Sequence, residues 1–92
     1  MDLVVILPVF NGMKYLKDNI QSVLNQNYVD FQFFILDDCS TDGSWEYLTS
    51  INDDRITLKR NQSNKGLFYN LNYMIKNSSA KLIKLWAQDD IM

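Results

Sequence analysis

The hydrophobic positions of this 92-residue chain follow two alternating patterns. Continuous apolar runs predict strands buried on both faces at Leu3 to Leu7, where Pro8 is expected to end the strand, and at Phe31 to Leu36. A weaker alternation from Arg55 to Lys59 predicts a third strand near a sheet edge, and a fourth strand is expected at about Ala80 to Trp86.

Segments with helical periodicity separate these strands. Three faces carry apolar residues at helical spacing: Leu16, Ile20, Val23 and Leu24 in the first, Trp45, Leu48 and Ile51 in the second, and Leu67, Leu71, Met74 and Ile75 in the third. Asn11 is a candidate N-cap for the first helix, and Ser40, Thr41 and Asp42 offer caps for the second.

Strands that alternate with amphipathic helices predict an α/β fold, a Rossmann-like, doubly wound, mainly parallel sheet in three layers, α/β/α. Right-handed crossovers would place the first strand centrally, the second and third on one side of it, and the fourth on the other. In such sheets ligands bind outside the carboxyl ends of the strands. The segments 8–12, 37–42 and 88–90 are expected at that edge.

The composition excludes several classes of protein. Nine basic against eleven acidic residues give a net charge of −2, which is not the electrostatic footprint of a nucleic-acid-binding protein. The chain has no histidine, so histidine-based triads and zinc sites are excluded. A single cysteine, Cys39, suits a reducing cytoplasm. The longest apolar run, Leu3 to Phe10, is less than half of the ~20 residues that a membrane span requires, and no secretory signal is visible.

Two pairs of acidic residues follow predicted strands. Asp37 and Asp38 come after the second, and Asp89 and Asp90 after the fourth, so the pairs should lie about 10 Å apart at one edge. Carboxylates without histidine favour Mg²⁺ or Mn²⁺ carrying a diphosphate. The alternative is structural: helix capping for Asp37, Asp38 and above all Asp42, and a solvated chain end for the second pair.

Two other ligand motifs fail when their positions are counted. A calcium-binding EF-hand loop starting at Asp38 would need glutamate at its twelfth position, which is Thr49. A phosphate-binding glycine loop fails because the three glycines, Gly12, Gly43 and Gly66, lack the required spacing.

Six short motifs stand in order along the chain: PVFN, SVLNQ, DDCSTD, DDRI, NKG and QDD. With them, the chain resembles the N-terminal half of family 2 glycosyltransferases, nucleotide-sugar-dependent enzymes with the GT-A fold. The resemblance extends over essentially the whole chain. It implies that residues 1–92 form a single nucleotide-binding half of a glycosyltransferase domain, with the sheet ending after the fourth strand and the acceptor-binding half absent.

The resemblance implies nucleotide-binding roles for matched positions of this sequence. The turn after the first strand would line the nucleotide site: Pro8, Val9, Phe10 and Asn11. Asp38 would contact a pyrimidine base, normally uracil or thymine, with Asp37 beside it, and Asn64 and Gly66 would run along the nucleotide. Asp89 would hold the ribose and, with Asp90, bind the Mn²⁺ or Mg²⁺ that carries the diphosphate of a UDP- or dTDP-sugar.

Two positions depart from the family pattern. Ala87 stands where many relatives carry a further aspartate, so the acidic motif here is the adjacent pair alone, as in some relatives. Cys39 stands where glycine or asparagine is usual, and is interpreted as a small loop residue.

The resemblance also implies a reaction, an inverting in-line displacement in which a metal stabilises the departing nucleoside diphosphate and a carboxylate base deprotonates the acceptor. That base is expected beyond residue 92, so no catalytic residue is predicted here, no glycan acceptor should bind, and this chain alone should not transfer sugar. Family members act in polysaccharide synthesis, which suggests the cytoplasm or the inner face of the membrane.

Two further expectations stay open at this point. The fold alone is equally compatible with a non-catalytic nucleotide- or protein-binding α/β module, because this architecture hosts many functions. The fourth strand should present a bare edge and uncovered apolar faces, which favours self-association of the chain.

Overall fold

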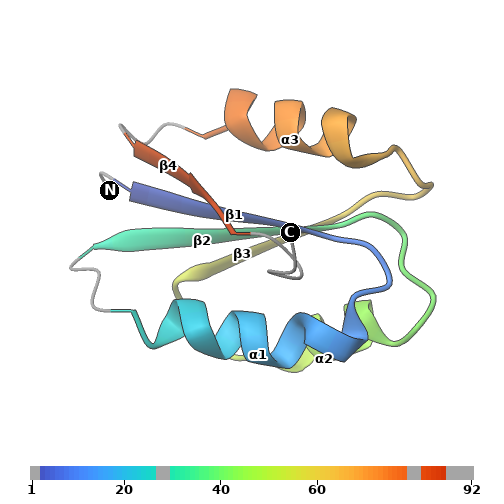
Figure 1. Cartoon of the computed structure of the whole chain (residues 1–92), viewed down its shortest axis with the longest axis horizontal. Coiled ribbons are helices and arrows are strands. Elements are labelled where there is room, and N and C mark those ends of the chain that lie inside the picture. The colour runs from blue at the N-terminus through green and yellow to red at the C-terminus, as the bar shows by residue number, and fades with distance from the viewer. Residues whose placement is uncertain (1–2, 27–29, 79–81, 87–92) are drawn as a thin grey trace.

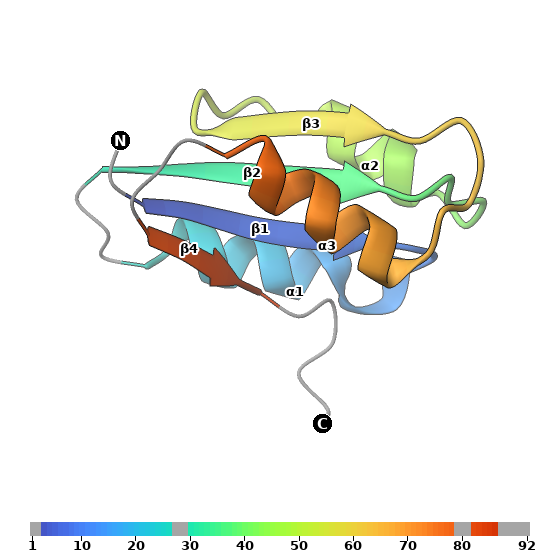
Figure 2. The ribbon, with the colours of Figure 1, turned by 90° about the horizontal axis from the view of Figure 1, so that it is seen from above.

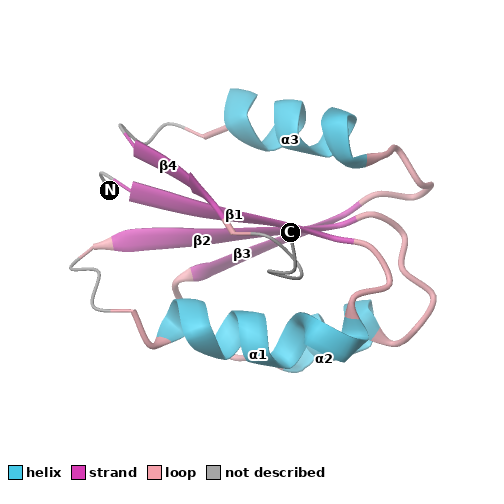
Figure 3. Cartoon of the chain, in the orientation of Figure 1, coloured by secondary structure: helices cyan, strands magenta, loops and turns pink. Residues whose placement is uncertain are grey.

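The structure is a computed structural model that describes residues 3–26, 30–78 and 82–86. Strands and helices alternate along the chain in the order β1 (Leu3–Val9), α1 (Met13–Leu24), β2 (Phe31–Asp37), α2 (Ser44–Ser50), β3 (Ile56–Arg60), α3 (Leu67–Lys76) and β4 (Leu82–Leu85). Helices α1 and α2 cover one face of the central sheet and α3 covers the other (Figures 1 and 3). The predicted three-layer α/β architecture is confirmed.

The four strands form one parallel sheet in the order β3-β2-β1-β4, as predicted. All four therefore point the same way, as Figure 2 shows from above. The register places Val9, the last residue of β1, opposite Asp37, and Asp37 opposite Arg60, the last residue of β3. Three strands thus end side by side, and the loops that follow them start from one line.

The core is divided by the sheet into two parts, because successive side chains of a strand point to opposite faces. On the α1 and α2 side, Val5 and Leu7 pack with the predicted apolar face of α1. On the α3 side, Val4 and Ile6 pack with Met74. The central strand β1 is buried on both faces, which explains its continuous apolar run.

Pro8 does not end the first strand, which continues to Val9. Proline lacks the N–H group that a central strand normally donates. On the β4 side, the carbonyl of Ile6 accepts a hydrogen bond from the N–H of Trp86 (2.9 Å), and the pairing of β1 with β4 reaches no further than Ile6. Pro8, two residues on, lies beyond this pairing, so within the described residues its missing N–H interrupts no hydrogen bond between β1 and β4.

The predicted inner face of α3 is confirmed in part. Met74 is buried and Leu71 packs against the same cluster, as expected, but Leu67 and Ile75 are exposed and Asn70 is buried. The physical reason is a polar contact: the Asn70 side chain accepts a hydrogen bond from the Asn61 side chain after β3 (2.7 Å), which draws Asn70 inward.

Strand β4 lies at the sheet edge and is exposed along its whole length. Its apolar side chains Leu82, Ile83 and Leu85 are all exposed, as are Phe68 and Tyr69 on α3. Within the described residues, no helix combines the length and the apolar character needed to cross a membrane.

Phe33→Ala tests the core. Phe33 is fully buried in β2, so removing its ring should lower the free energy of unfolding by about 3–5 kcal/mol, a large part of the roughly 5–15 kcal/mol of a small domain. Urea denaturation measures the loss. Phe68→Ala is the matched control, because Phe68 is 82% exposed, and it should change the stability by about 0.5 kcal/mol or less. Equal losses in the two variants would contradict this core.

Candidate functional site

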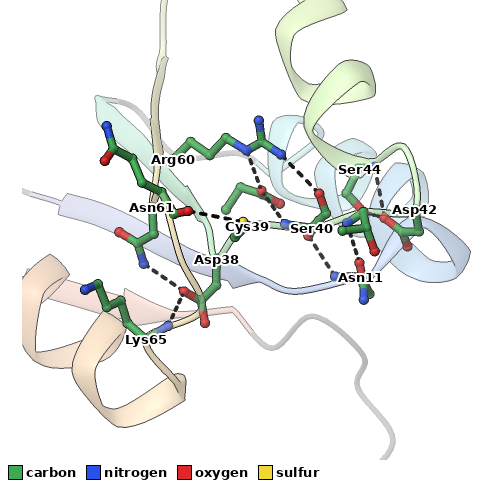
Figure 4. Close-up of polar contacts among 12 residues, drawn as sticks. Asn11, Asp38, Cys39, Ser40, Asp42, Ser44, Arg60, Asn61 and Lys65 are labelled. Carbon is green, nitrogen blue, oxygen red and sulfur yellow. Dashed lines mark hydrogen bonds and ion pairs between the residues drawn. The ribbon is translucent and has the colours of Figure 1, made fainter.

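Three polar loops meet at the carboxyl edge of the sheet. They connect β1 to α1, β2 to α2 and β3 to α3, and they comprise residues 10–12, 38–43 and 61–66. Hydrogen bonds join these loops, and an ion pair joins the ends of β2 and β3 beneath them (Figure 4). The prediction that segments 8–12 and 37–42 lie at one edge is therefore confirmed.

Asn11 connects the first loop to the second. Its backbone N–H donates to the Ser40 hydroxyl oxygen (2.8 Å), and its side-chain oxygen accepts from the Thr41 N–H (2.8 Å). Asn11 has a φ of +49°, in the left-handed region that asparagine tolerates better than most residues. The prediction that Asn11 caps α1 is wrong: the N-cap is Gly12, and the Asn11 side chain bonds the neighbouring loop instead.

Asp42 supplies the acceptors that the helix starts need. One carboxylate oxygen accepts from the N–H of Met13, the first residue of α1 (3.0 Å), and the other from the N–H of Ser44, the first residue of α2 (3.0 Å). Partial burial raises the pKa of Asp42, but the hydrogen bonds from Ser44 and Met13 outweigh it and hold the pKa below its usual value. The prediction that Ser40, Thr41 or Asp42 caps α2 is wrong, because its N-cap is Gly43, but the Asp42 carboxylate accepts N–H groups at the starts of both helices.

Asp37 lies inside the protein, with 0% of its surface exposed. Its Oδ2 accepts from the Ser40 N–H (2.9 Å) and lies 3.6 Å from Nε of Arg60. Its Oδ1 has no hydrogen-bond partner among the described residues. All described contacts of this carboxylate are therefore made by Oδ2, and its hydrogen bond with Ser40 fixes the start of the second loop.

Asp38 connects the second loop to the third. Its Oδ1 accepts from the Asn61 side chain (2.8 Å) and the Lys65 N–H (2.8 Å), and its Oδ2 from the Gly66 N–H (3.0 Å). Burial raises the pKa of Asp38, but the hydrogen bonds, led by that of Asn61, outweigh it and lower the pKa overall. The ionised carboxylate thus occupies the positive N-terminal end of α3.

The remaining predicted positions differ in exposure. Pro8 and Val9 are buried in β1, and the Val9 carbonyl accepts from the Asp38 N–H (2.7 Å). Phe10 and Asn64 are exposed in the first and third loops. Gly66, with a φ of +89°, adopts a conformation that side chains disfavour, which lets its N–H reach Asp38.

Three polar residues of this cluster were not predicted from the sequence: Arg60, Asn61 and Asn70. Arg60 and Asn61 stand at the end of an edge strand, where polar residues usually face solvent. Asn70 interrupts the apolar face of α3, and this polar residue was the sequence feature that could have indicated a buried hydrogen bond.

Asp89 and Asp90, the predicted metal ligands, lie outside the described residues, as does Ala87. Within 3–26, 30–78 and 82–86, no group of three or more histidine, cysteine or acidic residues could hold a metal ion. Asp37, Asp38 and Asp42 accept hydrogen bonds from backbone N–H groups.

The fold and the loop arrangement define an α/β domain of the GT-A glycosyltransferase type. The structure of residues 1–349 of S. aureus TarS in complex with UDP-GlcNAc superposes with a TM-score of 0.87 at 24% identity, covering 97% of this chain and 27% of that one. The mannosyltransferase PcManGT of Pyrobaculum calidifontis, in complex with GDP-Man and Mn²⁺, superposes with a TM-score of 0.72 at 20% identity, covering 85% of this chain and 24% of that one. At these identities the likeness concerns the fold.

The family follows from the sequence comparison. The model of glycosyl transferase family 2 matches residues 4–92, and this chain belongs to that family. WfgD of Escherichia coli, named a UDP-Glc:α-D-GlcNAc-diphosphoundecaprenol β-1,3-glucosyltransferase, is 31% identical over 87 residues, which cover 95% of this chain and 34% of WfgD. The chain spans about a third of the length of most curated relatives it matches, and less of the others.

Asp42→Ala tests the shared acceptor of α1 and α2. Loss of the carboxylate leaves two helix-start N–H groups without a partner, so the free energy of unfolding at pH 7 should fall by about 1–2 kcal/mol in urea denaturation. Because folding lowers the pKa of Asp42, its contribution is present above the unfolded pKa of about 3.9 and is lost as the pH falls further. The difference from wild type should therefore shrink at pH 3. Asp18→Ala, in the exposed part of α1, is the control and should leave the stability within about 0.5 kcal/mol.

Proposed function

We propose that this chain is the donor-binding part of an inverting, metal-dependent glycosyltransferase that takes sugar from a UDP- or dTDP-sugar. The observation that carries the proposal is the hydrogen-bonded meeting of three loops at the carboxyl edge, in a chain of glycosyl transferase family 2. These loops contain the proposed nucleotide-binding positions Phe10, Asn11, Asp38, Asn64 and Gly66. Pro8, Val9 and Asp37 would support the site from beneath it, because all three are buried in the strands β1 and β2 and precede the loops.

Asp38 is the proposed base-recognition residue. Its lowered pKa keeps the carboxylate ionised near neutral pH, so it accepts hydrogen bonds and does not donate them. Oδ2 accepts one hydrogen bond in the structure and retains acceptor capacity. The imide N–H of uracil or thymine is a matching donor, whereas the corresponding ring nitrogen of cytosine carries no hydrogen. The carboxylate would thereby favour UDP and dTDP over CDP.

Asp89 and Asp90 are the proposed residues for the ribose and for Mn²⁺ or Mg²⁺. Adjacent carboxylates are the ligands that these cations prefer, and the structure of PcManGT contains GDP-Man and Mn²⁺. When bound, the metal would offset the negative charge of the nucleoside diphosphate. The general base and the glycan acceptor site are proposed to lie outside residues 1–92.

The setting of the reaction is proposed from the relatives. WfgD is named for glucosyl transfer to a GlcNAc-diphosphoundecaprenol, which supports a glycan acceptor in polysaccharide biosynthesis for this chain. A nucleotide-sugar donor and the single free cysteine suit the cytoplasm, including the inner face of the membrane.

The second candidate is a non-catalytic nucleotide- or protein-binding module. One observation favours it: the carboxylates of Asp37, Asp38 and Asp42 are already hydrogen bonded within the protein, as structural roles require. The two candidates differ in the metal, because only the transferase proposal assigns a cation to Asp90.

Titration with UDP separates these candidates. Isothermal calorimetry should show that Mn²⁺ tightens UDP binding about tenfold or more, and that Asp90→Ala removes this gain but keeps the metal-free affinity. Asp38→Ala should weaken binding of UDP with and without metal. Asp54→Ala, an exposed carboxylate at the opposite end of β3, is the matched control and should bind as wild type.

Two results would contradict the transferase proposal. UDP binding that is indifferent to Mn²⁺ and to Asp90→Ala would favour the binding module. No UDP binding under either condition would exclude a nucleotide site in this chain.

The exposed strand β4 supports a further partner, a second copy of this chain. Apolar side chains of Leu82 and Leu85 are exposed on the strand that ends the sheet within the described part of the chain, and an edge strand promotes pairing between molecules. Sedimentation velocity should therefore show association that grows with concentration. Leu85→Lys should weaken it, whereas Asn52→Lys, at an exposed loop position away from β4, should not. A wild-type protein that stays monomeric at high concentration would refute this proposal.

A further inference from the structure

Arg60 joins three segments at the carboxyl edge of the sheet. It is the last residue of β3, and its Nε lies 3.6 Å from Oδ2 of Asp37 at the end of β2. Its Nη2 donates to the Ser40 carbonyl in the second loop (3.1 Å; Figure 4), and its guanidinium lies 5.5 Å from the centre of the Trp45 ring in α2. One side chain thus contacts β2, the loop after it and the following helix.

Asp37 needs this arginine. A buried carboxylate is costly unless a positive charge and hydrogen bonds compensate it. Asp37 is fully buried, and only its Oδ2 has partners among the described residues, the Ser40 N–H and Arg60. Loss of the guanidinium would leave the buried charge with one hydrogen bond. The loop would then have to shift to hydrate it.

Ser40 lies between Arg60 and the first loop and is hydrogen bonded to both. Its N–H is held by Asp37 and its carbonyl by Arg60, so both backbone groups of Ser40 are fixed. Its hydroxyl oxygen then accepts the backbone N–H of Asn11 (2.8 Å). A continuous set of contacts therefore leads from Arg60 through Ser40 to the turn proposed to line the nucleotide.

We infer that Arg60 is a positioning residue for nucleotide binding, acting through Ser40 and Asn11 without touching the ligand. The inference rests on the proposed nucleotide site. Direct contact with a diphosphate is the competing role, since 39% of the side chain is exposed. The geometry favours positioning, because Nε and Nη2 are directed at Asp37 and Ser40 and the guanidinium lies over Trp45.

Arg55 provides a matched control at the other end of the same strand. It precedes β3, forms an ion pair with Asp53 (2.8 Å), and its guanidinium lies 5.3 Å from the centre of the Phe31 ring. The two arginines thus share an ion pair with aspartate and an aromatic neighbour. They differ in the edge of the sheet at which they act.

The experiment measures UDP affinity in the presence of Mn²⁺ for wild type, Arg60→Gln, Arg60→Lys and Arg55→Gln, together with the melting temperature of each. Arg60→Gln should weaken binding about tenfold, and Arg60→Lys, which keeps the charge but not both contacts, about threefold. Arg55→Gln should bind as wild type even where its melting temperature falls. In ligand-free protein, the NMR amide signals of Ser40 and Asn11 should move in the Arg60 variants and stay in place in Arg55→Gln.

Salt dependence separates positioning from direct contact. A lost phosphate contact reduces the salt dependence of the dissociation constant, whereas a lost positioning residue weakens binding equally at low and high salt. We expect the Arg60→Gln curve to run parallel to that of wild type between 50 and 300 mM NaCl, roughly the range over which screening grows strong. A flattened curve would overturn the positioning role.

The remaining outcomes are also decisive. If wild type binds UDP and Arg60→Gln binds equally well, the inference is wrong and the nucleotide site stands. If wild type does not bind UDP, the proposed function fails and the inference with it. Should Arg60→Gln not fold, Arg60→Lys decides: weaker binding with displaced Ser40 and Asn11 signals supports the inference, and unchanged affinity overturns it.

Discussion

Backbone N–H groups at the starts of loops and helices need acceptors, and the aspartates that follow β2 supply them. Asp38 accepts from Lys65 and Gly66 before α3, and Asp42 accepts from the first residues of α1 and α2. Asp37, Asp38 and Asp42 are close in the sequence, where their like charges would repel each other, but in the structure each carboxylate accepts hydrogen bonds from its own set of donors. The charges of Asp38 and Asp42 stabilise helix starts, and together they bring three helices into register with one edge of the sheet.

This arrangement combines structural and functional demands in the same side chains. In the proposed function, Asp38 recognises a base through Oδ2, which accepts one hydrogen bond among the described residues, while its other contacts hold the third loop. Preorganisation of this kind lowers the cost of ordering a site when ligand arrives. Asp37 has the opposite arrangement, since it is buried and affects the surface only through Ser40 and Arg60.

Much of the fold was predictable because strand order and burial follow from local patterns. The continuous apolar runs gave β1 and β2, and the right-handed crossover rule gave their neighbours. Contacts of individual side chains were harder to predict from the sequence. The end of β1 depends on where β4 stops pairing with it, and the orientation of α3 depends on the hydrogen bond between Asn61 and Asn70. Arg60 could not be assigned from the sequence, because its role requires the register that sets it opposite Asp37.

Helix α3 has a modest apolar anchor, since only Met74 among its apolar residues is fully buried. The helix is therefore held more by hydrogen bonds. The Asp38 carboxylate accepts from the Gly66 N–H at the helix start and from the Asn61 side chain, and the Asn61 side chain also donates to Asn70. Such bonds are directional and exchange with water more readily than packed hydrocarbon does. In the proposed function, binding of a nucleotide at Asp38 would therefore be thermodynamically linked to the rigidity of α3, and the exposed aromatic side chains Phe68 and Tyr69 would report it as a change in mobility.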